Sequence, residues 1–73
     1  MIVTFLGKTK EVSVILDDLS KEAAKITIRK ALKALPDAQF VIFFEKASIA
    51  RVDDLTASKF VEIANRKDTL KRI

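Results

Sequence analysis

Five basic side chains, spaced for one side of a helix, are the residues in this sequence best suited to binding chemistry. They lie within residues 21–33, where the only acid is Glu22, and together with it they account for the whole net charge of +4. Like charges four residues apart on a helix repel by roughly 0.2–0.5 kcal/mol per pair, a cost that an anionic partner offsets. The five are Lys21, Lys25, Arg29, Lys30 and Lys33.

A nucleic-acid backbone is the anionic partner that this spacing favours. Cations repeated at steps of about 6 Å along a helix suit a row of phosphates, and such binding is independent of base sequence and weakened by salt. Lys8 and Lys10, in a predicted turn, extend the basic surface. Specific base reading has little support, because Arg29 is the helix's only residue of the types that commonly contact base edges. A hydrated lysine face without a partner is the alternative.

The residue types present argue against catalysis. The chain has no His and no Cys, which excludes Ser-His and Cys-His nucleophiles and Cys/His zinc sites, and its single Gly excludes a glycine-rich phosphate loop. Asp17-Asp18 and Asp53-Asp54 each precede a predicted helix, where carboxylates usually cap the first turn. We therefore predict a non-enzymatic binding protein with no metal site and no small-molecule cofactor.

The elements that must position the cations begin with a hairpin. Residues 2–6 and 11–16 are β-branched and apolar, and Gly7 is expected to supply unusual backbone angles in the turn between them. Ser20 caps a predicted helix over residues 21–35, which Pro36 ends. Ile26 falls among the cations, and the other apolar residues fall on the opposite side: Ala24, Ile28, Ala31, Leu32 and Leu35.

The second half of the chain repeats this order of elements. Residues 39–46 are apolar on both sides, which predicts a central strand with Phe40, Ile42 and Phe44 on one face and Val41 and Phe43 on the other. Residues 48–52 form a weaker strand candidate. A second helix follows residues 53–56, and its apolar positions are Ala57, Phe60, Val61 and Ala64, with Ile63 at the margin. Whether residues 68–73 continue this helix stays open.

An internal repeat is suggested by two similar helix starts. Asp17-Asp18-Leu19-Ser20 and Asp53-Asp54-Leu55-Thr56 lie 36 residues apart, each after a strand and before a helix. We predict one α+β domain over residues 1–73, with an antiparallel sheet, both helices on one face, and the order ββαββα. The alternative order is ββαβα, if residues 48–52 are not a strand.

Helices on only one face leave the other face of the sheet bare. An apolar patch of that size is uncommon on monomers, so we expect a partner, most simply a second copy of the chain. The predicted interface residues are Phe40, Ile42, Phe43 and Phe44. A protein-interaction or assembly module using this face is thus an alternative function. No apolar stretch approaches the roughly 20 residues of a membrane helix and no signal-peptide pattern is present, which predicts a cytoplasmic protein without a membrane partner.

Overall fold

The chain forms a four-stranded sheet and two helices in the predicted order ββαββα. The computed structural model describes residues 1–46 and 48–66, so the predicted extension over residues 68–73 lies outside the described residues. Because residues 48–51 form a strand, the alternative order ββαβα is wrong. The elements are β1 (Ile2–Leu6), β2 (Glu11–Ile15), α1 (Lys21–Ala34), β3 (Phe40–Phe43), β4 (Ser48–Arg51) and α2 (Ala57–Ala64), with the short 3₁₀ helices η1 (Phe44–Lys46) and η2 (Val52–Asp54).

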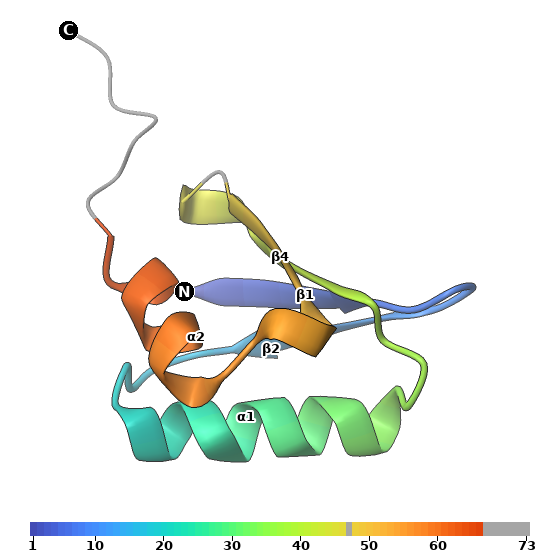
Figure 1. The fold of residues 1–73 in the computed structure, drawn as a ribbon, viewed down its shortest axis with the longest axis horizontal. Helices are drawn as coiled ribbons and strands as arrows, with labels where there is room; N and C mark the ends of the chain where they lie inside the picture. The colour runs from blue at the N-terminus through green and yellow to red at the C-terminus, as the bar shows by residue number, and fades with distance from the viewer. Residues whose placement is uncertain (47, 67–73) are drawn as a thin grey trace, which may run out of the picture.

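The strands are ordered β2-β1-β3-β4 and every neighbouring pair is antiparallel. Both helices lie on the same face of this sheet (Figure 1). The central position predicted for β3 is confirmed, but the strand ends at Phe43 and the chain turns into η1. The Ile2 backbone N–H donates to Oε1 of Glu45 at 3.3 Å, which ties η1 to the start of β1.

The core lies between the sheet and the helices. Val3 and Phe5 of β1 and Val41 and Phe43 of β3 are all 0% exposed. The Phe43 ring meets the ring of Phe60 edge to face, with centroids 5.1 Å apart and planes at 65°. Phe43 was predicted with the interface residues, and that placement is corrected here, because its side chain points into the core and not onto the bare face.

Each helix buries a wider side than its apolar residues alone indicate. In α1 the polar residue Thr27 is only 9% exposed, between the buried Ala24 and Ala31 of the neighbouring turns. In α2, Ile63 is 3% exposed although the periodicity put it at the margin. Each helix packs against the sheet and also against the other helix. These two contacts together bury a wider side of the helix than contact with the sheet alone would.

Both helices begin with a capping hydroxyl, which confirms the cap predicted at Ser20, whereas Asp53 and Asp54 lie in η2 and Thr56 caps α2. Ser20 Oγ accepts from the Ala23 backbone N–H at 3.2 Å, and Thr56 Oγ1 accepts from the Lys59 backbone N–H at 3.1 Å. Asp18 in turn accepts from the Ser20 backbone N–H at 3.0 Å and from its hydroxyl at 3.2 Å. Asp18 therefore fixes the orientation of the capping serine, the structural use expected of a carboxylate before a helix.

Gly7 packs closely against side chains after α1 and has no unusual backbone angle. Its φ lies outside the left-handed region, which corrects the reason expected for this glycine. A Cβ at this position would lie 2.7 Å from Oδ1 of Asp37 and 3.1 Å from Cδ1 of Leu35. The hairpin turn thus sits directly against the segment that follows α1.

The hydrogen-bond pattern shows an internal pseudo-symmetry. The Leu16 backbone N–H donates to the carbonyl of Met1 at 2.7 Å, and the Val52 backbone N–H donates to the carbonyl of Gln39 at 2.8 Å. Met1 and Gln39 are 38 residues apart, whereas Leu16 and Val52 are 36 apart. Equivalent hydrogen bonds therefore close the two hairpins, and the second hairpin is shorter than the first by the difference between these spacings.

Candidate functional site

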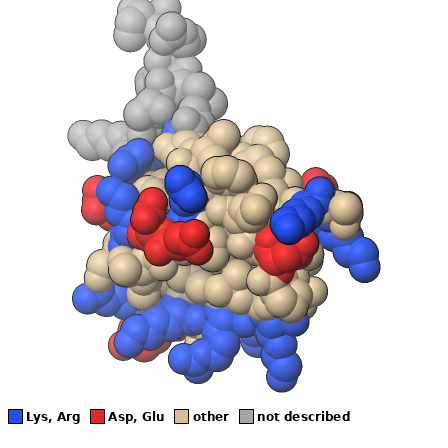
Figure 2. Space-filling model, turned by 45° about the vertical axis from the view of Figure 1, so that its right-hand side comes forward, with Lys and Arg blue, Asp and Glu red and all other residues tan. Residues whose placement is uncertain are grey.

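The basic face of α1 comprises the five predicted cations: Lys21, Lys25, Arg29, Lys30 and Lys33. All five side chains are exposed, and none forms an ion pair within the part of the chain that the structure describes. From the first to the last they span about 18 Å along the helix. Figure 2 shows the resulting band of basic side chains along the lower edge of the molecule, over α1.

The charges of α1 interact with the helix dipole and with one another. Lys33 in the last turn interacts favourably with the helix dipole and Glu22 in the first turn offsets the unfavourable position of Lys21. Two unit charges about 6 Å apart in water repel by roughly 0.7 kcal/mol before screening by salt. The folded chain thus carries a modest repulsion along this face, which a bound polyanion relieves.

An apolar strip lies beside two of these cations. A groove of about 500 Å³ separates α1 from the segment that enters α2, and its lining consists of Lys25, Ile28, Arg29, Leu32, Leu55 and Ala57. Ile26, predicted among the cations, is 52% exposed on α1. A partner lying along α1 therefore meets exposed apolar side chains as well as charge.

Lys8 and Lys10 lie near the C-terminal end of α1. The Lys8 backbone N–H donates to Oδ2 of Asp37 at 3.3 Å, and Asp37 follows α1 closely in the chain. In Figure 1 the tip of the first hairpin lies at the same end of the molecule as the end of α1. Both lysines are exposed, but the Asp37 carboxylate beside this turn weakens the positive potential there.

The bare face of the sheet is strongly apolar. Strand alternation and register direct the following residues away from the helices, and they define the open face: Ile2, Thr4, Leu6, Glu11, Ser13, Ile15, Phe40, Ile42, Ile49 and Arg51. Ile15 is 69% exposed, Ile49 68% and Ile2 49%. Phe44 continues the series after Ile42 and is 60% exposed at the start of η1.

The polar centre of the open face is internally satisfied. The hydroxyls of Thr4 and Ser13 lie 2.9 Å apart and hydrogen-bond to each other. Thr4 is only 5% exposed, although it points away from the helices. A partner that covers this part of the face therefore leaves neither hydroxyl without a hydrogen bond.

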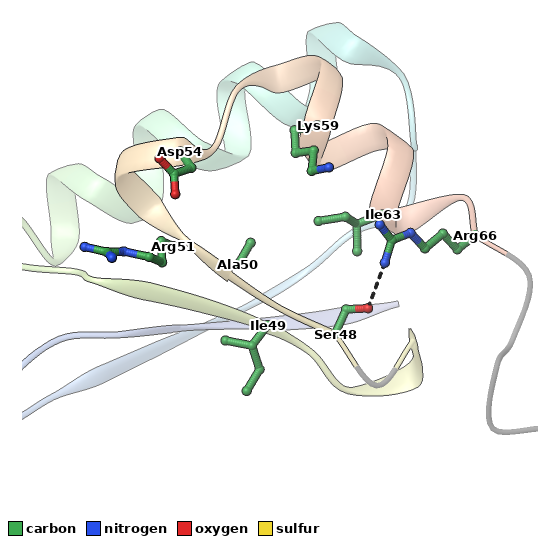
Figure 3. A pocket seen from close by; sticks show the side chains of 8 residues that line it. All are labelled: Ser48, Ile49, Ala50, Arg51, Asp54, Lys59, Ile63 and Arg66. Atoms are coloured by element: carbon green, nitrogen blue, oxygen red, sulfur yellow. Dashed lines mark hydrogen bonds between the residues drawn. The ribbon is translucent and has the colours of Figure 1, made fainter.

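A second group of cations, which the sequence did not reveal, lines a cavity between β4 and α2. Figure 3 shows this cavity of about 470 Å³, bordered by Ser48, Ile49, Ala50, Arg51, Asp54, Lys59, Ile63 and Arg66. Arg66 Nη1 donates to Ser48 Oγ at 3.2 Å. Glu62 lies 3.8 Å from Lys59 and 4.0 Å from Arg66, so two of the three cations already face an acid. Residues spread over positions 48–66 carry no periodic signal, and only the packing of α2 beside β4 brings them together.

Within residues 1–46 and 48–66, no three His, Cys, Asp or Glu side chains converge as metal ligands. Comparison with protein-family models, curated proteins and solved structures found no match. In the same residues, no helix has both the length and the apolar composition needed to cross a bilayer. Function must therefore be inferred from the surfaces of the chain itself.

Proposed function

We propose that this protein is a non-enzymatic binding protein that holds a nucleic-acid backbone against the basic face of α1. One observation carries the proposal. Five exposed cations, without ion-pair partners among the described residues, share one 14-residue helix with a single acid. The only ion pairs seen between described side chains involve Glu62 of α2, which meets Lys59 of the same helix and Arg66 just after its end.

The expected mechanism is neutralisation of phosphates with release of their counterions. Each phosphate neutralised on duplex DNA contributes about −0.9 to the slope of log K against log salt concentration. Contacts from four of the five cations therefore give a slope of about −3.6. Because α1 offers charge and few base-reading groups, mixed-sequence DNA and RNA duplexes should bind with similar affinity.

A matched pair of variants tests the proposal. K25Q/R29Q removes one Lys and one Arg from α1. K59Q/R66Q removes the same residue types from α2 and from the residues just after it, so both variants have the same net charge. Binding to a labelled mixed-sequence duplex is followed by fluorescence anisotropy at several salt concentrations. The first variant should reduce the magnitude of the slope by about 1.8, whereas the second should leave it unchanged.

Two results would end the proposal. One is equal loss of binding in both variants, which would mean that net charge alone attracts the nucleic acid. The other is an affinity for wild type that does not change between low and moderate salt. Circular dichroism of each variant controls for folding, and all four substituted side chains are exposed.

A second candidate function is protein assembly through the open face. The observation that favours it is the distribution of the large hydrophobic side chains that the structure leaves exposed. Ile26 lies on α1, whereas Ile2, Ile15, Phe40 and Ile49 lie on the open face and Phe44 continues it. The open face and α1 are on opposite sides of the sheet, so one molecule can use both surfaces.

A further inference from the structure

The open face has a defined pattern of charge as well as apolar side chains. Glu11 pairs with Leu6, Leu6 with Phe40, and Phe40 with Arg51, so these four residues form one row across the sheet. Glu11 and Arg51 are the two ends of that row, separated by three strand spacings, or about 14 Å. Both are exposed, and neither forms an ion pair within the described residues. Arg51 is the last residue of β4, at the edge of the sheet, where it also borders the cavity between β4 and α2.

We propose that a second copy of this chain covers the open face, related by a two-fold axis that runs parallel to the strands. Such a rotation exchanges the two edges of the sheet and keeps each residue at its own level along the strands. It places β2 of one copy over β4 of the other, and β1 over β3. Glu11 of each copy then faces Arg51 of the other, which gives two reciprocal ion pairs at the rim.

The same axis sets small side chains against large ones. Ser13 of β2 lies level with Ile49 of β4 in the second copy, and Thr4 of β1 lies level with Ile42 of β3. The exposed Ile49 side chain thus has a small residue opposite it. Figure 3 shows Ile49 on the side of β4 that faces away from α2. Two sheets that pack in this way align to within about 30°, at a separation of about 10 Å.

The other two-fold arrangement of the sheets is unfavourable. An axis perpendicular to the strands lays each strand over its own copy and reverses the level along it. Glu11 would then lie over Ile15, at the opposite end of the same strand. A carboxylate buried against an apolar side chain without a partner is costly, so charge selects the axis parallel to the strands.

The size of the face sets the expected affinity. Four strands about 4.8 Å apart and five residues of about 3.3 Å each give a flat footprint of about 300 Å². Even with the larger accessible area of real side chains, this is below the roughly 800 Å² per partner of a standard interface. The small face therefore predicts a weak, reversible dimer, which sedimentation at protein concentrations up to the millimolar range can detect.

Charge reversal tests the pairing in the absence of any nucleic acid. Sedimentation equilibrium is measured for wild type, E11R, R51E and the double variant E11R/R51E. Each single variant should raise the dimer dissociation constant about tenfold, because two exposed pairs change from attraction to repulsion. The double variant should return to within about threefold of wild type. E22R, the same substitution on α1, is the matched control and should not change the constant.

Rescue in the double variant also excludes misfolding as the cause of the single effects. A wild-type protein that stays monomeric at millimolar concentration overturns the proposal. A dimer that is indifferent to E11R and R51E, or that the double variant does not restore, also overturns it and indicates pairing through a sheet edge. A failure of nucleic-acid binding would leave these results unaffected, so the two proposals stand or fall separately.

Discussion

Replacing Phe43 with alanine should destabilise the monomer far more than replacing its neighbour Phe44. Phe43 is 0% exposed and its ring packs edge to face on Phe60 at 5.1 Å, whereas Phe44 is 60% exposed. The two residues are adjacent and of one type, so composition and hydropathy are the same in both variants. The comparison therefore tests whether Phe43, at the end of β3, points toward the helices while Phe44, at the start of η1, does not.

The expected magnitudes follow from burial. Truncation of a core phenylalanine to alanine costs about 3–5 kcal/mol, and an exposed substitution changes stability by about 0.5 kcal/mol or less. A domain of 73 residues has a total free energy of unfolding of about 4–11 kcal/mol. F43A thus removes about a quarter of the stability or more. F43L, which keeps most of the side-chain volume, should cost about 1.5 kcal/mol and remain folded.

Urea unfolding followed by circular dichroism measures these differences at protein concentrations low enough to keep the chain monomeric. F43L should lower the urea midpoint, and F43A should lower it further. The free energy of unfolding of F44A should lie within about 0.5 kcal/mol of wild type. A loss of 2 kcal/mol or more in F44A, together with little change in F43A, would refute the reasoning. It would mean that the open face and the core face of β3 are exchanged.

Three further predictions concern the caps, the turn and the dimer. S20A should cost about 1 kcal/mol in urea unfolding because the Ala23 backbone N–H loses its acceptor, and an unchanged midpoint would contradict this role of Ser20. G7A should cost no more than about 1 kcal/mol, because the crowded Asp37 oxygen ends an exposed side chain that can move, and this cost should shrink in a D37A background; full additivity of the two changes would count against the contact. At protein concentrations above the dimer dissociation constant, wild type should bring two separately labelled duplexes together in a fluorescence-transfer assay, because the α1 helices of the proposed dimer lie on opposite outer surfaces. Binding without transfer would contradict that arrangement.

Much of the fold could be predicted because its signals are local. The bounds of β1 and α1 follow from side-chain alternation, a capping serine and a proline after the helix, all within a few residues. The face to which Phe43 points could not be predicted in this way. A strand that is apolar on both sides has no local signal for which side the helices cover, and only its pairing with β1 decides it. Thr27 was missed because a polar residue in the buried arc breaks the apolar pattern.

The candidate surfaces also differ in whether local sequence signals predict them. The basic face of α1 could be predicted because a spacing of four residues fixes a side of a helix regardless of the rest of the chain. The charged row from Glu11 to Arg51 and the cavity between β4 and α2 could not, since each joins strands or helices that are distant in sequence. Such sites depend on strand register and helix packing, which appear only in the folded chain.

The dependence of wild-type binding on salt tests the central claim most directly. The association constant for a mixed-sequence DNA duplex is measured at five or more salt concentrations, and log K is plotted against log concentration. Contacts from four or five cations of α1 predict a slope between about −3.6 and −4.5 for each bound helix. A slope near zero, or no binding at low salt, would contradict the claim that α1 holds a nucleic-acid backbone.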